Sequence, residues 1–179
     1  MSDIQLIRYQ EQLNKYLEPL KRKGFDSIRF PGGTSKNGRN SAFVIYMQEF
    51  AHEKYYLVLP YQSSFHQREK INLVDKYEGP KNTAVREFKE EVRVKIDANF
   101  LESYYVVLAE DNSNRKKTHK KYFYKYKQEI AEFLEYSLDF ETEDVEETTT
   151  PFFIKNTLLR GNLFWKHYEV FKNGWRKKR

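Results

Sequence analysis

The chain has 179 residues, of which 39% are hydrophobic and 17% aromatic, which is enough apolar material for one domain with a core. It contains no cysteine, which excludes disulfides, thiolate metal sites and cysteine nucleophiles, so any metal must be held by oxygen or histidine ligands. The net charge of +6 comes from 32 basic and 26 acidic residues, which suits a polyanionic partner without requiring one.

The first residues, MSDIQLIRYQEQLNKYL, lack the apolar segment of a signal peptide. No stretch elsewhere approaches the about 18 apolar residues of a membrane span. We therefore expect a cytoplasmic protein with no membrane partner. The leucine spacing in the same region predicts an accessory helix over residues 1–24, which Gly24 ends. The glycine-rich stretch 31–40, PGGTSKNGRN, has little apolar content and is interpreted as a flexible connection.

The following part of the chain alternates between strand and helix patterns. A hairpin is predicted from 41–50 and 55–62, which are rich in β-branched and aromatic residues and are separated by a short loop. Further strands are predicted at 71–74, 101–110, 120–127 and 151–154, the last of them at a sheet edge. Helical spacing is found at 81–93 and 158–171, and a short helix or irregular segment at 129–138.

These patterns predict an α+β fold, similar to an α/β/α sandwich, with one mixed sheet. We expect a single domain over residues 1–179, with its core at 41–172 and a frayed basic tail at 173–179.

One predicted helix carries the clearest chemical signal. If residues 81–93 are helical, Glu87, Glu90 and Glu91 lie at positions i, i+3 and i+4, so their carboxylates converge on one face. Apolar side chains lie on the opposite face and would hold the helix on a core, namely Ala84, Val85, Phe88 and Val92. Clustered like charges need a compensating cation, which a divalent metal supplies. A solvated helix face is the alternative, and composition alone favours it.

The spacing around this helix resembles the Nudix box, the pattern G-x5-E-x7-R-E-U-x-E-E-x-G-U, in which U is a bulky apolar residue. The matching stretch spans residues 72–94, and Phe88 and Val94 fill the two apolar positions. All five charged positions match, through Glu78, Arg86, Glu87, Glu90 and Glu91. Asn72 and Arg93 stand where the two glycines belong. These departures concern loop geometry more than metal ligands, since glycine serves backbone freedom and glutamate serves chemistry.

The resemblance implies a fold and an activity. Nudix domains resemble this order of a hairpin, a box helix, further strands and a closing helix, here over about residues 41–172. The implied activity is hydrolysis of a nucleoside diphosphate linked to another moiety, with Mg²⁺ or Mn²⁺ as the cofactor. By position, Glu87, Glu90 and Glu91 would ligate the metal. Arg86 would position them, and Glu78 would support the helix or complete the metal shell.

No motif identifies the nucleotide. Tyr61 and Gln62, at the end of the second predicted strand, are the candidate substrate-binding residues, and the expected partner is a small molecule containing a nucleoside diphosphate. Whether the protein forms a homodimer stays open.

Two alternatives come from other classes. A non-catalytic Nudix-like sensor would bind a nucleotide without cleaving it; the missing box glycines favour it and the intact glutamates oppose it. A nucleic-acid-binding protein would use the basic aromatic stretch 115–127, although a sheet-edge strand with outward lysines explains that stretch more simply.

Overall fold

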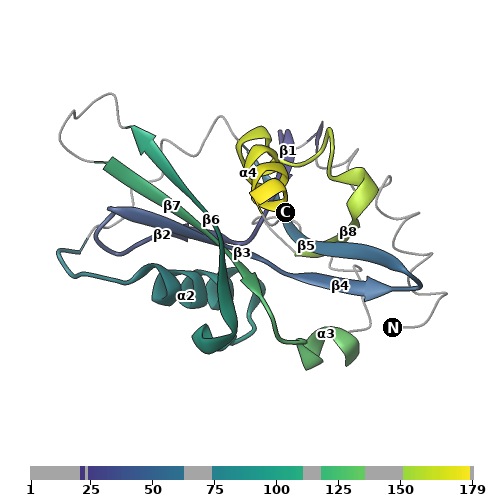
Figure 1. The fold of residues 1–179 in the computed structure, drawn as a ribbon, viewed down its shortest axis with the longest axis horizontal. Helices are drawn as coiled ribbons and strands as arrows, with labels where there is room; N and C mark the ends of the chain where they lie inside the picture. The colour runs from purple at the N-terminus through teal and green to yellow at the C-terminus, as the bar shows by residue number, and fades with distance from the viewer. Residues whose placement is uncertain (1–20, 23, 63–73, 111–117, 136–150, 178–179) are drawn as a thin grey trace.

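The structure is a computed structural model and describes residues 21–22, 24–62, 74–110, 118–135 and 151–177. Strands and helices are mixed along these residues, which confirms the predicted α+β class (Figure 1). The predicted accessory helix lies outside the described residues except at its end, where residues 21 and 22 are helical. The strand predicted at 71–74 also lies outside them except for Val74, which is not in a strand.

One four-stranded sheet has the order β2-β3-β7-β6. Its strands are β2 (Gly32–Thr34), β3 (Asn40–Ile45), β7 (Thr118–Tyr126) and β6 (Leu101–Glu110). This sheet is mixed, because β3 and β7 run parallel while the other neighbours run antiparallel. The prediction of a single mixed sheet is nevertheless wrong, because the described strands form two sheets.

The expectation that residues 31–40 form a flexible connection is wrong, because residues 32–34 pair with β3 as strand β2. This strand has no apolar side chains, so hydrophobic patterning could not find it. Position 32 requires glycine because the backbone of β3 lies very close to it. A β-carbon on Gly32 would lie 2.2 Å from the carbonyl oxygen of Ala42.

A second group of four strands is built around β5 (Glu53–Tyr61), which pairs with β1 (Ser27–Arg29), β4 (Met47–Phe50) and β8 (Phe152–Lys155). The predicted hairpin is formed by β4 and β5. Ala51 and His52, both with positive φ (49° and 66°), form its turn, which suits the twist of a tight hairpin. The first predicted strand is interrupted at Tyr46, so β3 and β4 belong to different sheets.

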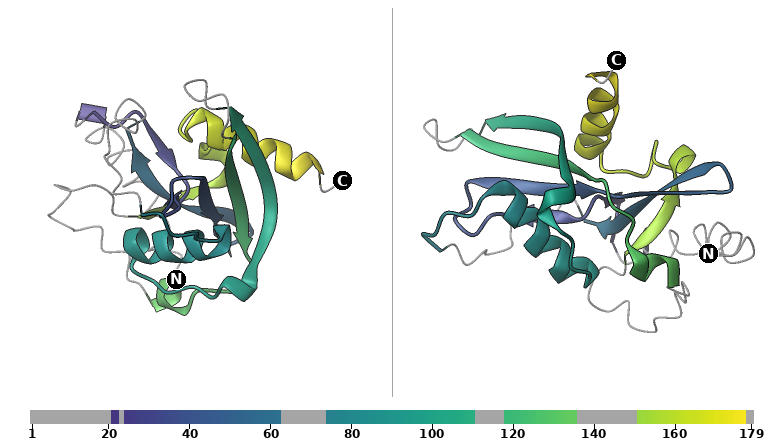
Figure 2. Two further views of the ribbon diagram at one scale, coloured as in Figure 1. Left: turned by 90° about the vertical axis from the view of Figure 1, so that its left-hand side faces the viewer. Right: turned by 60° about the horizontal axis from the view of Figure 1, so that its bottom comes forward.

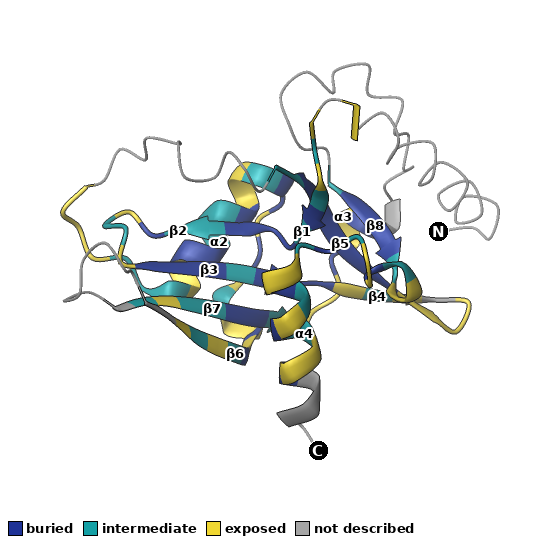
Figure 3. Cartoon of the chain, turned by 90° about the horizontal axis from the view of Figure 1, so that it is seen from above, coloured by how far each residue is buried: buried dark blue, intermediate teal, exposed yellow. Residues whose placement is uncertain are grey.

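Two helices lie on opposite faces of the β2-β3-β7-β6 sheet, as in a sandwich (Figures 1 and 2). They are α2 (Pro80–Val92) and α4 (Trp165–Lys177). β3 is mostly buried (Figure 3). Its side chains alternate between the two sides: Val44 shares a core cluster with Phe88 of α2, whereas Ile45 shares another with Val170 of α4.

The closing helix differs from its predicted bounds at both ends. A 3-10 turn, η3 (Asn156–Leu158), and Gly161 with φ 88° precede it, so α4 starts at Trp165 rather than at residue 158. The helix continues to Lys177, so most of the predicted frayed tail is helical. The remaining short elements are η1 (Ala98–Phe100) and α3 (Ala131–Glu135). The second lies within the segment 129–138, for which a short helix or an irregular segment was predicted.

β7 is an interior strand between β3 and β6, and not the edge strand expected from its lysines. Its rings enter both cores, with Tyr124 on the α2 side and Phe123 on the α4 side. These rings are therefore not available as a stacking surface for nucleic acid. Of the helices within the described ranges, none has the length and apolar character needed to cross a membrane.

Candidate metal-binding glutamate site

Helix α2 presents the site glutamates from one face. It begins at Pro80, after Gly79 in an extended conformation, and proline suits this position because its missing N–H would have no helical partner there. Phe88 is buried on the opposite face. The helix predicted at 81–93 and the burial of Phe88 are thus confirmed.

Arg93 caps the end of the helix with φ 64° and ψ 27°, in the left-handed region, at the place where the Nudix box has its second glycine. Its backbone N–H donates to the carbonyl of Lys89 at 2.9 Å. Its side chain is exposed and has no described contact with the site glutamates. The substitution therefore leaves the glutamate face open.

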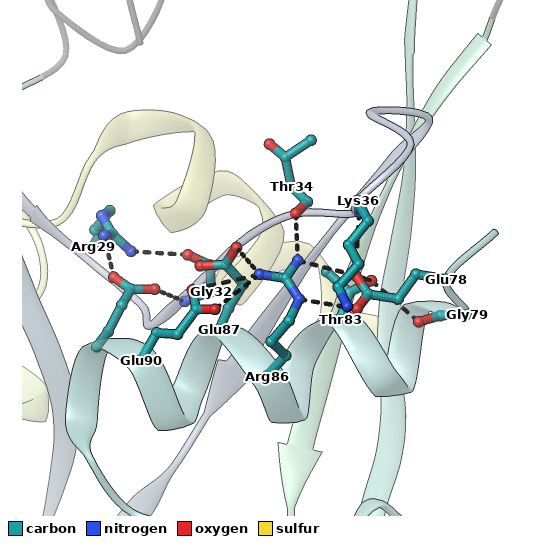
Figure 4. Close-up of polar contacts among 11 residues, drawn as sticks. Arg29, Gly32, Thr34, Lys36, Glu78, Gly79, Thr83, Arg86, Glu87 and Glu90 are labelled. Carbon is teal, nitrogen blue, oxygen red and sulfur yellow. Dashed lines mark hydrogen bonds and ion pairs between the residues drawn. The ribbon is translucent and has the colours of Figure 1, made fainter. Parts of the chain in front are cut away.

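Arg86 and Glu78 join the loop before α2 to the helix itself. Arg86 Nε donates to Glu78 Oε2 and Arg86 Nη2 donates to Glu78 Oε1, both at 2.9 Å (Figure 4). Glu78 also accepts hydrogen bonds from Thr83 Oγ1 at 2.8 Å and from the Lys36 backbone N–H at 3.2 Å. A two-point pair of this kind fixes both side chains in direction.

The same guanidinium connects Glu78 to the rest of the site. Arg86 Nη2 donates to the carbonyl of Thr34 in β2 at 2.9 Å. Arg86 Nη1 donates to Glu87 Oε1 at 2.9 Å and to Glu90 Oε1 at 3.2 Å. Arg86 therefore positions two of the glutamates against β2.

Both glycines of β2 lie close to glutamates of α2. The Gly32 N–H donates to Glu91 Oε1 at 2.9 Å. A β-carbon on Gly33 would lie 2.5 Å from Glu87 Cδ, so a larger residue would displace that carboxylate. Asn72 occupies the first glycine position of the box in sequence and lies outside the described residues. In space, glycines from β2 approach the box helix.

Arg29, the last residue of β1, is the second arginine of the site. Its Nη2 forms an ion pair with Glu91 Oε2. Its Nη1 donates to the carbonyls of Phe30 at 3.1 Å and Gly32 at 3.4 Å. Its guanidinium carbon lies 5.9 Å from the centre of the Tyr61 ring. Sequence reasoning missed Arg29, Gly32 and Gly33; the Pro-Gly-Gly run was the only signal that could have indicated the glycines.

Burial is the largest influence on the pKa of two glutamates, Glu87 and Glu91. It raises the pKa of Glu87 to about 7, with the negative charge of Glu91 adding to the rise and Arg86 opposing it. Burial also raises the pKa of Glu91, against the lowering effect of Arg29. By contrast, the hydrogen bonds from Arg86 lower the pKa of Glu78. Glu90 is the most exposed of the four, with 57% of its side chain accessible.

As arranged here, the carboxylates are held by arginines. Within the ranges that the structure describes, no group of three or more acidic or histidine side chains is gathered as a metal cluster. Arg86 binds Glu87 and Glu90, and Arg29 binds Glu91. The oxygen donors nevertheless suit a hard cation. The raised pKa of Glu87 also marks a place where additional positive charge would be stabilising. The residues therefore fit a divalent cation once an arginine contact is exchanged for it.

The two candidate substrate-binding residues, Tyr61 and Gln62, have different neighbours. The Tyr61 ring lies near Arg29 and packs against Phe164, with ring centres 4.8 Å apart. Gln62 lies near Gly24, where an added β-carbon would be 2.6 Å from Gln62 Nε2. Tyr61 is therefore close to a side chain of the glutamate site, and the substrate role of both residues stays a prediction.

No family model matches the chain, and no curated protein matches it. Among solved structures, it is similar to the Ap4A hydrolase of C. elegans at 12% identity, with a TM-score of 0.41 and coverage of 78% of this chain and 98% of that one. It is also similar to a MutT/nudix family protein from Enterococcus faecalis at 14% identity, with a TM-score of 0.34. This second match covers 70% of this chain and 49% of the other, about half its length. Since both TM-scores are low, the functional assignment depends on the contacts of the site.

Proposed function

We propose that the chain is a metal-dependent Nudix-type hydrolase that cleaves the pyrophosphate bond of a nucleoside diphosphate linked to another moiety. The observation that carries this proposal is that Arg86 connects three of the four box glutamates, while the fourth, Glu91, lies on the same helix. Arg86 links Glu78 to Glu87 and Glu90, while Glu91 lies on the same helix against the Gly32 N–H. A solvated helix face would not need this network.

The proposed roles follow from position and charge. Glu87, Glu90 and Glu91 would hold Mg²⁺ or Mn²⁺, which supplies charge neutralisation at the diphosphate oxygens and makes a water molecule more acidic. Arg86 would orient the glutamates and Glu78 would fix Arg86. Tyr61 would offer its ring to the nucleoside. We also propose that the protein acts in the cytoplasm.

In the sensor alternative, the protein has the same glutamates but binds a nucleotide without cleaving it. This alternative is favoured by the arginine contacts, which neutralise the carboxylates without a metal. It is opposed by the cluster of negative charge, which is unsuitable for a pure phosphate binder because its ligand is an anion. The nucleic-acid alternative has no support in the described residues, because the rings of β7 are packed in the two cores.

The test is a panel of diphosphate compounds assayed with Mg²⁺, with Mn²⁺ and without metal. It should contain dinucleoside polyphosphates, sugar nucleotides, NADH and 5′-triphosphate RNA. We expect metal-dependent cleavage of at least one compound. Glu90→Gln and Glu91→Gln should each reduce kcat/KM by about a hundredfold or more, which is about 2.7 kcal/mol of transition-state stabilisation.

Glu102→Gln is the matched control, because Glu102 is half-exposed on β6 and its ion pair with Lys127 is long, at 3.9 Å. It should leave cleavage unchanged. If no compound is cleaved with either metal, yet one binds tightly without metal, the sensor takes the place of the enzyme. If cleavage survives glutamine at both Glu90 and Glu91, the chemistry lies elsewhere.

A further inference from the structure

Glu91 has one cationic partner among the contacts that the structure describes, and that partner comes from outside the box. Arg29 pairs with Glu91 Oε2 through Nη2, while the Gly32 N–H occupies Oε1. The Glu91 side chain is only 15% exposed, so its carboxylate has few other sources of solvation. A buried carboxylate without a counter-charge is strongly unfavourable. Arg29 therefore neutralises the negative charge of Glu91, as a bound metal ion would.

Arg29 and a divalent cation cannot use Glu91 in the same way at once. A cation bound at this carboxylate would lie within a few ångströms of the guanidinium. With partial screening, two unit charges at 4 Å repel by about 4 kcal/mol, and a divalent cation doubles that figure to about 8 kcal/mol. The arginine can leave without losing all its partners, because Nη1 also bonds to two backbone carbonyls. Its guanidinium already lies near the Tyr61 ring, and 20% of the side chain is exposed.

We propose that Arg29 is an exchangeable counter-cation of the glutamate site. It neutralises Glu91 in the metal-free protein, releases that carboxylate when a divalent cation binds, and then donates to an anionic oxygen of the diphosphate. This inference rests on the proposed function, since it assumes that the glutamates take a metal. It adds a residue outside the box that couples metal binding to substrate binding.

The chemistry of the guanidinium supports the second half of this exchange. Arginine presents a planar fork of donors that matches carboxylates and phosphates alike. A donor set released from Glu91 is therefore suited to a phosphate oxygen arriving at the same place. Tyr61, beside the guanidinium, would lie on the side of the site from which the nucleotide approaches.

The test measures metal binding without substrate. Titration with Mn²⁺, followed by the electron paramagnetic resonance signal of the free ion, should give a dissociation constant for the unmodified protein and for Arg29→Gln. We expect Arg29→Gln to bind Mn²⁺ at least about fivefold more tightly, because it removes the competing charge. The same variant should bind ADP, in saturating Mn²⁺, at least about fivefold more weakly, because one charge-assisted contact to phosphate is lost.

Arg160→Gln is the matched control, since it removes an exposed arginine outside the site. It should change neither constant by more than about twofold, the scale of a screened surface charge. Arg29→Lys covers the case in which Arg29→Gln does not fold. It keeps the charge but loses the fork, so its Mn²⁺ affinity should stay within about twofold of the original while ADP binding weakens.

The outcomes separate the two levels of inference. If the unmodified protein binds no Mn²⁺ and cleaves nothing in the panel, the proposed function fails. If it binds Mn²⁺ but Arg29→Gln binds the ion equally well or more weakly, the exchange is overturned and the proposed function stands. Unchanged ADP affinity in both Arg29 variants would overturn the phosphate contact.

Discussion

Gly33 and Glu87 lie against each other although they are 54 positions apart in the sequence (87 − 33). An added β-carbon on Gly33 would lie 2.5 Å from Glu87 Cδ and 2.6 Å from Glu87 Oε2. Glycine at this position is thus a condition for the place that the Glu87 carboxylate occupies. The strand β2 contributes to the site through the absence of a side chain.

Gly33→Ala should therefore impair the site more than the fold. The methyl group must push the Glu87 carboxylate away, and we expect Mn²⁺ affinity to fall by about tenfold or more while unfolding free energy falls by only about 1 kcal/mol. Calorimetric Mn²⁺ titration and urea denaturation measure the two effects. Gly79→Ala is the matched control, because its nearest neighbour, Asn82 Nδ2, would be 4.0 Å from the new carbon. Equal effects of the two substitutions would contradict the steric account.

Arg86→Ala should be the most destabilising single change in the site. It leaves Glu78, which has only 10% of its side chain exposed, without its two-point partner, and it frees the carbonyl of Thr34. We expect a loss of about 2–4 kcal/mol in unfolding free energy, with Arg86→Lys losing less because it keeps the charge. Urea denaturation without metal measures both. Lys155→Ala, which breaks the half-exposed pair with Glu53, should cost under about 1 kcal/mol.

The raised pKa of Glu87 predicts that the stability of the unmodified protein and that of Glu87→Gln differ by an amount that depends on pH. Because the folded pKa of Glu87 is about 7 and its ordinary value is 4.5, the folded protein holds a proton there that the unfolded chain has lost. Stability from this group is therefore present below pH 4.5 and decreases as pH rises towards 7. Glu91, whose pKa is also raised, acts in the same direction. Buried His167, whose pKa is lowered, acts in the opposite direction below about pH 6.5.

The difference between Glu87→Gln and the unmodified protein isolates this group. In metal-free buffer, the variant should become more stable relative to the unmodified protein by about 1–3 kcal/mol between pH 5 and pH 8. Urea midpoints at four pH values give this difference directly. A difference that stays constant across the range would contradict the raised pKa.

The helical part of the site could be predicted because its signal is local. Glu87, Glu90 and Glu91 share a face by helical spacing alone, and Phe88 is buried on the other face, as expected. The pairing of Arg29 with Glu91 could not be predicted, since it depends on the strand arrangement that brings the end of β1 within side-chain reach of α2. β2 was missed for a related reason: its place is decided by close packing, which has no hydrophobic pattern.

The same limit explains the errors in the fold. β7 looks like an edge strand because lysines and rings are mixed in it, but an interior strand can place its rings in two cores and its lysines near its ends. The interruption at Tyr46 has no local signal either, because both halves of the stretch 41–50 have strand composition. Which sheet a strand joins is decided by its neighbours.

The last prediction concerns Arg93, which holds a left-handed conformation at φ 64° at the end of α2. A β-carbon disfavours this conformation, and glycine adopts it without that penalty. Arg93→Gly should therefore stabilise the protein by up to about 1 kcal/mol, the strain relieved minus the extra flexibility of the unfolded chain. Arg93→Ala keeps the β-carbon and should give no such gain, so the pair separates backbone strain from loss of the exposed guanidinium. Thermal or urea denaturation decides between them. A larger gain from alanine than from glycine would mean that charge, and not backbone conformation, limits this end of the helix. Catalytic constants should stay unchanged in both variants, because Arg93 makes no described contact with the site glutamates.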